Sequence, residues 1–304
     1  MKKSVLLTGA TGFIGRHAIA PLIARGYEIH AVTSKPERTA QNVHWHRANL
    51  LDARETAQLV AGVRPTHLLH FAWYAEPGKF WKSKENFRWL EAGIALLQRF
   101  SESGGRRAVM AGSCAEYDWD YGYCSEAVTP CRPQTPYGTC KLALQEVLRS
   151  YSETEKLSSA WGRLFHLYGP AEHPARLVSS VITSLLGNET AKCTHGSQIR
   201  DFMHVEDAAS AFAALLDSDV EGPVNISTGT PVTLRKVVLA AADCLGMRER
   251  VHFGAIAAPE GEPPLLVGDC RRLAIEVGWH QQLELHKGME KTVDWWKKKG
   301  TGIS

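Results

Sequence analysis

The chain has little net charge, no long hydrophobic run and no paired-cysteine motif. Its 304 residues carry 35 Lys and Arg against 32 Asp and Glu, a net charge of +3, which is too small to favour a nucleic-acid or membrane partner. No stretch approaches the roughly 18 apolar residues of a membrane span, and Thr8-Gly9 interrupts the first apolar run, so we expect no secretory leader. The seven cysteines are odd in number and lack a C-x-x-C spacing, which predicts free thiols in a reducing cytoplasm and no metal site.

Short apolar runs alternate with helical segments through the first half of the chain. Strands are predicted at residues 4–8, 28–32, 67–72, 107–112 and 159–167. One helix is predicted to end near residue 25, and others to cover about 53–62, 87–100 and 136–157. This alternation predicts an α/β fold with a Rossmann-type, doubly wound parallel sheet. Such sheets bind their ligands at the carboxyl ends of the strands.

The pattern loosens into shorter elements after Gly169-Pro170. Helices are predicted at about 175–187, 206–217 and 233–246, between short strands and Gly/Pro turns. Because the chain is long for a single core, we expect a dinucleotide-binding domain over residues 1–168. A smaller C-terminal α/β substrate domain covers residues 169–304, and some of its segments, such as 200–229, are expected to pack back on the first domain.

A glycine-rich segment, residues 8–15 (TGATGFIG), follows the first predicted strand. Gly9 allows a tight turn, Gly12 lets the backbone approach a pyrophosphate, and Gly15 allows close packing of helix on strand. The following helix directs its amino end at the phosphates. The spacing differs by one residue from G-x-G-x-x-G, but its place between strand and helix predicts a dinucleotide site. Its members are Gly9, Thr11, Gly12, Phe13, Ile14 and Gly15.

The end of the second predicted strand bears on the choice between the two nicotinamide cofactors. An NAD site has an acidic residue there for the ribose hydroxyls, whereas this chain has residues 33–38 (TSKPER). Ser34 can hydrogen-bond a phosphate, and Lys35 and Arg38 can neutralise its charge. The segment therefore favours NADP(H), and Glu37 leaves NAD(H) open.

Tyr137 and Lys141 are four residues apart, so they share one face of a helix. The phenol has an unperturbed pKa of about 10, which a nearby ammonium and a positive nicotinamide are expected to lower. Tyr137 can then exchange a proton near neutral pH, while Lys141 holds the cofactor ribose. Ser113 ends a predicted strand and can bond a substrate oxygen. We predict Ser113, Tyr137 and Lys141 as the catalytic group.

These motifs resemble those of the extended short-chain dehydrogenase/reductases, in the NAD-dependent epimerase/dehydratase group that acts on nucleotide sugars. The resemblance runs to about Trp296 and includes residues 163–170 (RLFHLYGP), 200–207 (RDFMHVED) and 225–229 (NISTG). It implies a homodimer and a nucleotide-diphosphate sugar as substrate. It extends the cofactor contacts to Asn49, Leu50, Phe71, Ala72, Trp73, Tyr137, Lys141, Phe165 and His166, and it implies substrate contacts at Ser113, Cys114, His166, Arg176 and Arg200.

Departures from the family pattern reduce the number of reactions that the resemblance allows. Sugar 4,6-dehydratases place an Asp-Glu pair directly after the catalytic Ser or Thr, where this chain has Cys114 and Ala115. Enzymes that combine 3,5-epimerisation with reduction have a cysteine at the position of Ala115. His166 replaces the usual substrate-binding asparagine, and it either binds sugar or nicotinamide or packs beneath the site. A cluster of aromatic residues either lines a pocket or packs as core: Trp73, Trp81, Trp89 and Trp119.

The remaining set of one phenol, one lysine and one serine is sufficient for reversible ketone and alcohol chemistry. The resemblance implies NADP-dependent reduction of a keto group, at C4 of a nucleotide-diphosphate 4-keto-6-deoxyhexose, with Tyr137 as the proton donor. A C4 epimerase that keeps its cofactor bound is the alternative enzyme. A non-catalytic NADP(H) sensor or scaffold is the alternative of another class, since fold does not fix function.

Overall fold

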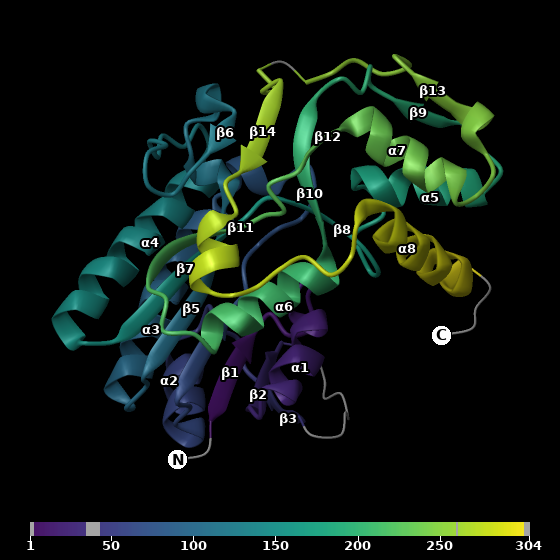
Figure 1. Cartoon of the computed structure of the whole chain (residues 1–304). Coiled ribbons are helices and arrows are strands. Elements are labelled where there is room, and N and C mark those ends of the chain that lie inside the picture. The colour runs from purple at the N-terminus through teal and green to yellow at the C-terminus, as the bar shows by residue number, and fades with distance from the viewer. Residues whose placement is uncertain (1–2, 35–42, 260, 301–304) are drawn as a thin grey trace.

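A seven-stranded parallel sheet forms the centre of the larger part of the molecule (Figure 1). The computed structural model describes residues 3–34, 43–259 and 261–300. The strands lie in the order β11 (Gly222–Ile226), β7 (Ser158–Leu164), β5 (Arg107–Ser113), β4 (His67–His70), β1 (Ser4–Thr8), β2 (Glu28–Thr33) and β3 (Val43–Arg47). The chain runs outward from β1 in one direction and from β4 in the other. Sheets with such a reversal bind their ligands at the carboxyl ends of the two strands where it occurs.

Helices cover both faces of this sheet because its strands direct apolar side chains to both sides. In β1, Val5 and Leu7 join one apolar cluster and Leu6 joins the other, as the two-residue period of a strand requires. One face is covered by α1 (Gly15–Ala24) and α6 (Val205–Leu216). The other is covered by α2 (Ala53–Val63), α3 (Glu85–Glu102) and α4 (Pro136–Glu155).

A smaller part sits over the carboxyl edge of the sheet (Figure 1). A second sheet contains β12 (Pro231–Thr233), β10 (Ile199–His204), β14 (Leu265–Gly268), β6 (Tyr123–Cys124) and β8 (His166–Tyr168), and β9 (Ala191–Cys193) pairs with β13 (Val251–Phe253). Three helices share an apolar core there: α5 (Leu177–Leu186), α7 (Leu234–Asp243) and α8 (Leu285–Gly300). Short 3-10 turns are η1 (Phe80–Lys82), η2 (Cys114–Glu116), η3 (Trp119–Tyr121) and η4 (Arg248–Arg250), and η5 (Arg272–Glu276) is a π-helical turn.

The predicted doubly wound parallel sheet is confirmed, with two differences in its strands. The strand expected at residues 159–167 is divided at Phe165, because β7 stays in the large sheet while β8 pairs with β10. Strand β3 was not predicted, since its sequence VHWHR mixes polar and apolar residues at the sheet edge. The domain division at residue 168 remains a prediction. In the structure β11 pairs with β7, so this later segment completes the first sheet.

Across the described residues, no helix combines the length and apolar character that crossing a bilayer requires.

Candidate active site

The glycine-rich loop between β1 and α1 is closed by its own backbone. Gly9 has a φ of +66°, and a Cβ there would lie 2.8 Å from the amide nitrogen of Ala72. The amide of Gly12 donates to the carbonyl oxygen of Gly9 at 2.8 Å. A Cβ on Gly15 would overlap that same carbonyl oxygen. The turn can therefore lie against Ala72, and the start of α1 against the turn, only because Gly9 and Gly15 lack side chains.

Replacing Gly15 by alanine is expected to open this turn and to weaken NAD(P)(H) binding by at least about tenfold, or ~1.4 kcal/mol. The affinity is measured by titrating the protein with the cofactor and following the intrinsic fluorescence. The matched control is Gly62→Ala in α2, where an added Cβ meets nothing within 4 Å. That control should leave binding unchanged and gain about 0.5–1 kcal/mol of stability. Equal affinity for the Gly15 variant and the control would contradict the assignment of the loop.

Side-chain contacts tie the loop to the end of β4. The Thr8 hydroxyl accepts a hydrogen bond from the amide of Ala72 at 3.2 Å and bonds Nδ1 of His70 at 2.8 Å. Burial lowers the pKa of His70 to about 3, so its ring stays neutral. The Arg16 guanidinium donates to the carbonyl oxygens of Thr11 and Gly12 at 2.6 and 3.0 Å. Arg16 was missed from the sequence because it follows the motif rather than belonging to it.

The three predicted catalytic residues come together at the carboxyl edge of β5. Ser113 ends β5, and its side chain hydrogen-bonds the phenol of Tyr137. Tyr137 and Lys141 lie in the first turns of α4, which begins at Pro136 after the cap Thr135. The Lys141 ammonium donates to the carbonyl oxygen of Ala111 at 2.8 Å. The arrangement presents a proton donor, a hydroxyl and an ammonium in one place.

Burial controls the charges of this group. It raises the pKa of the Tyr137 phenol, and the bond from Ser113 opposes that rise without cancelling it. The sequence-based expectation was a lowered pKa, and in this structure burial prevails instead. Burial also lowers the pKa of Lys141 to about 7, although the charge of Glu116 opposes it. Tyr137 is therefore protonated at neutral pH and can donate a proton.

A buried ion pair supports the turn that carries Ser113. The Glu116 carboxylate is fully buried and accepts hydrogen bonds from the Ser113 amide at 2.7 Å, from Trp161 Nε1 at 3.0 Å and from Arg163 Nε at 2.7 Å. Ser113 Oγ accepts from the amide of Ala115 at 3.2 Å, which completes a capping box. Sequence reasoning missed Glu116, although the spacing of Ser113 and Glu116 is the capping-box signal.

A second group of polar side chains faces the site from β8 and β10. The Arg200 guanidinium is almost fully buried and pairs with the Glu262 carboxylate at 2.9 Å, which also accepts from Gln198 at 2.9 Å. His166 packs against Phe202 with ring centroids 5.5 Å apart, and its Nδ1 is buried without a partner among the described residues. Burial lowers the pKa of His166 to about 3, with Arg200 and Arg176 adding to the effect. It can hydrogen-bond a ligand but cannot act as a general acid at neutral pH.

Aromatic rings enclose Tyr137. The rings of Phe80, Trp81 and Trp73 lie edge-on to it, with centroids 4.8, 5.6 and 6.5 Å away. Trp119 packs against Trp81 at 6.1 Å, and the Arg176 guanidinium lies 5.5 Å from the ring centroid of Phe80. These residues thus surround the phenol, and Trp73 and Trp89 also pack against the apolar core on the face covered by α2, α3 and α4, so the cluster both packs and lines the surroundings of Tyr137. The thiol of Cys114 is buried beside this cluster, and burial raises its pKa.

The predicted adenine-side contacts are only partly described. Ser34 is exposed at the end of β2, whereas Lys35 and Arg38 lie outside the described residues. The register of β2 and β3 places Arg47 opposite Thr33, so an exposed cation that was not predicted adjoins Ser34. Nearby, Asn49 is exposed and Leu50 is buried. Of the other predicted cofactor contacts, Phe71 packs on Phe212, and Phe165 is buried.

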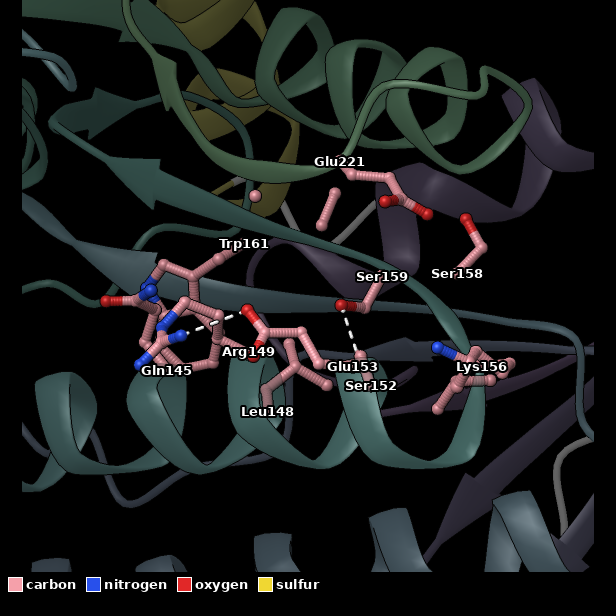
Figure 2. A pocket seen from close by; sticks show the side chains of 13 residues that line it. Gln145, Leu148, Arg149, Ser152, Glu153, Lys156, Ser158, Ser159, Trp161 and Glu221 are labelled. Atoms are coloured by element: carbon pink, nitrogen blue, oxygen red, sulfur yellow. Dashed lines mark hydrogen bonds and ion pairs between the residues drawn. The ribbon is translucent and has the colours of Figure 1, made fainter.

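Two hollows of the molecule differ in whether they reach the glycine loop, and neither is lined by the three predicted catalytic residues. The first hollow has a volume of about 670 Å³ and lies between α4 and β7. Figure 2 shows the side chains that line it, among which Ser152 bonds Ser159 and Arg149 pairs with Glu153. It lies toward the amino ends of β7 and β11 and contains none of the predicted site residues. A second hollow of about 740 Å³ reaches the glycine loop at Phe13 and is lined on its other side by Trp295 of α8. Within the described ranges, no three His, Cys, Asp or Glu side chains are grouped to hold a metal ion.

The comparison with known proteins decides the family. Residues 5–227 match the model of the NAD dependent epimerase/dehydratase family. The chain belongs to this family. It is 26% identical to a UDP-glucose 4-epimerase of Mycolicibacterium smegmatis, over 97% of this chain and 98% of that protein. It is 25% identical to a CDP-abequose synthase of Salmonella typhimurium, over 96% and 97%.

A solved structure extends the likeness to three dimensions. UDP-glucose 4-epimerase of Thermus thermophilus, in complex with NAD, superposes with a TM-score of 0.85 at 27% identity, covering 97% of this chain and 99% of that one. The fold expected from the sequence and the family resemblance are both confirmed. The names of these relatives refer to nucleotide sugars, and the Thermus structure holds NAD.

Proposed function

We propose that this chain catalyses the NADP-dependent reduction of a keto group, at C4 of a nucleotide-diphosphate 4-keto-6-deoxyhexose. The observation that carries the proposal is the hydrogen bond between Ser113 and Tyr137, with Lys141 one turn further along α4. The likeness to a CDP-abequose synthase supports a deoxysugar substrate. Two further parts of the proposal are a homodimer, on the family resemblance alone, and a cytoplasmic location, on the pattern of unpaired cysteines.

The glycine loop fits a dinucleotide, since it leads into α1, whose amino end has no side-chain cap and can face a pyrophosphate. Side chains at Gly9 or Gly15 would meet the protein's own backbone and distort this turn. When bound, the reduced nicotinamide supplies the hydride. Tyr137 is protonated at neutral pH and donates its proton to the carbonyl oxygen as charge develops there. Ser113 orients the same oxygen by a second hydrogen bond. Lys141 holds the cofactor ribose and favours the phenolate left after proton transfer.

The choice of NADP rests on charge at the end of β2. The strand ends without a carboxylate at Thr33 and Ser34, and Lys35 and Arg38 follow in the sequence. Arg47 opposite Thr33 adds a cation for a ribose phosphate. The structure of the Thermus relative contains NAD. The preference for NADP is therefore proposed from the residues of this chain and not from that relative.

Substrate recognition is assigned to three side chains. Arg200 binds the diphosphate, Arg176 contributes a second positive charge, and neutral His166 offers its unpartnered Nδ1 to the sugar. Dehydration is disfavoured because Cys114 is buried with a raised pKa and Glu116 is engaged by Arg163. Neither of these residues is free to act as the acid or base of an elimination.

The alternative is a C4 epimerase, which the likeness to UDP-glucose 4-epimerases favours. It would use the same three catalytic residues and regenerate its cofactor in each turnover. The test follows the absorbance of NADPH and NADH with a panel of nucleotide-diphosphate 4-keto-6-deoxyhexoses, with products separated by chromatography. We expect stoichiometric loss of NADPH with a new deoxyhexose. A new sugar without net loss of cofactor would instead establish the epimerase.

Glu262 is expected to compete with the substrate diphosphate for Arg200. Its carboxylate occupies the guanidinium at 2.9 Å, so a bound diphosphate must displace it or share the cation. The change Glu262→Gln should therefore tighten the binding of CDP, UDP or dTDP by about 3–10-fold, or ~0.7–1.4 kcal/mol, in calorimetric titrations. The control Glu249→Gln removes an exposed carboxylate of η4 and should have no effect. Weaker binding by the Glu262 variant would show that this carboxylate orients Arg200 instead.

A further inference from the structure

The Lys141 ammonium is buried without a carboxylate partner. Its side chain is 3% exposed, and its hydrogen bond goes to the neutral carbonyl oxygen of Ala111 at 2.8 Å. Among the described residues, no carboxylate lies within ion-pair distance of it; Glu116 acts on its charge from further away. The titratable groups around it are neutral His70 of β4, protonated Tyr137 of α4 and Glu116 of η2. A charge in such a place needs another source of stabilisation.

The indole ring of Trp73 meets this ammonium. Lys141 Nζ lies 3.8 Å from the ring centroid of Trp73, well within the range of a cation–π interaction, which is strongest for tryptophan and for a desolvated cation. Trp73 follows the end of β4 at the carboxyl edge of the sheet. The negative face of the ring thus replaces the counter-ion that the site lacks.

Asn86 fixes the ring in this position. Trp73 Nε1 donates to Asn86 Oδ1 at 2.9 Å, and Asn86 Nδ2 donates to the carbonyl oxygens of Phe80 and Ser83 at 2.7 and 2.9 Å. The amide is fully buried in the first turn of α3. Its orientation is determined, because the oxygen must face the indole donor and the nitrogen must face the two carbonyl groups.

The same amide couples the two catalytic side chains. Through the carbonyl of Phe80 it holds η1, whose residues Phe80 and Trp81 pack edge-on against Tyr137. Through Trp73 it holds the ring that faces Lys141. One buried side chain outside the catalytic group therefore sets the surroundings of both.

We propose that Trp73, held by Asn86, is the positioning residue that keeps the Lys141 ammonium charged and in place. The inference rests on the proposed function for the catalytic part of Lys141, but its physical content does not depend on which sugar is reduced. Removing the ring leaves the buried ammonium with only neutral partners, so the proton should be lost at lower pH.

The test is a pH titration of the Lys141 Nζ signal by nuclear magnetic resonance, in cofactor-free full-length protein labelled with nitrogen-15 at lysine. The wild-type pKa should lie near 7, and Trp73→Leu should lower the charged fraction at pH 8 by about tenfold. Trp73→Phe keeps a weaker π face and should fall between the two. The control Trp89→Leu removes a ring that contacts Trp73 at 6.5 Å and should leave the titration unchanged.

Asn86→Leu tests the anchor, and it should shift the titration in the same direction as Trp73→Leu by a smaller amount. Equal titration of Lys141 in wild type, Trp73→Leu and Trp73→Phe would overturn the inference. If Trp73→Leu fails to fold, the comparison of wild type with Trp73→Phe decides it.

Activity supplies a second readout that separates this inference from the proposed function. If the charged Lys141 is required, kcat/KM falls as pH rises through its pKa, and Trp73→Leu should move that alkaline limb to lower pH by about one pH unit. A merely structural role would lower kcat/KM equally at every pH and contradict the inference. A shifted Lys141 titration in a protein without activity on any keto sugar would instead reject the proposed function and leave the inference standing.

Discussion

Replacing Tyr137 by phenylalanine is expected to lower kcat by about 10²–10⁴-fold, the usual contribution of a positioned proton donor. The phenol hydrogen-bonds Ser113, and its raised pKa keeps the proton available at neutral pH. The ring would still fill its place between Phe80 and Trp81. The affinity for NADPH should therefore change little. Stopped-flow or steady-state kinetics with the keto sugar, beside a cofactor titration, measure both quantities.

A matched control for this change is Tyr151→Phe, which removes a phenol from the same helix α4 on its half-buried apolar side. That variant should keep wild-type kcat. Retention of more than about a tenth of wild-type kcat by Tyr137→Phe would remove Tyr137 from the role of proton donor. A loss of NADPH affinity as large as the loss of kcat would indicate a binding role instead.

Breaking the buried pair of Glu116 and Arg163 is expected to have the largest effect on stability. Glu116→Gln leaves the Arg163 guanidinium, which is 3% exposed, without its counter-charge. It also places an amide nitrogen among donors that now bond a carboxylate, including Trp161 Nε1. The free energy of unfolding should fall by about 3–5 kcal/mol, which urea denaturation at neutral pH measures.

The surface pair of Arg149 and Glu153 provides the comparison for this change. Both partners are more than half exposed, so Glu153→Gln should cost no more than about 0.5 kcal/mol. The double change Glu116→Leu with Arg163→Met removes both charges and should recover part of the lost stability, since the Ser113 amide and Trp161 Nε1 would still lack their acceptor. A loss below about 1 kcal/mol for Glu116→Gln would show that the pair does not support the Ser113 turn.

The parts of the site that depend on local order along the chain could be predicted from the sequence. The glycine loop follows from three glycines between a strand and a helix. The nearness of Tyr137 and Lys141 follows from helical spacing. The meeting of Ser113 and Tyr137 required the parallel order of the sheet, which the alternation of elements and the family resemblance both predicted.

The contacts that could not be predicted join residues whose pairing depends on tertiary structure. Glu116 meets Arg163 because β5 and β7 are neighbours in the sheet. Glu262 meets Arg200 because β14 lies beside β10.

The contacts of the aromatic residues could not be predicted for the same reason. The sequence left open whether they line a pocket or pack as core. Only the structure shows Trp73 facing Lys141. The prediction for the pKa of Tyr137 considered only the charges of Lys141 and the nicotinamide, whereas burial by Phe80 and Trp81 is visible only in three dimensions.

The most direct test of the proposed chemistry is transfer of deuterium from NADPH labelled at its transferable position to a nucleotide-diphosphate 4-keto-6-deoxyhexose. The account predicts one deuterium in the product sugar, at the carbon that bears the new hydroxyl, with one NADP formed for each product. Mass spectrometry and proton magnetic resonance of the isolated sugar read both the amount and the position. A new sugar that contains no deuterium and forms without NADP would contradict the account and identify an epimerase.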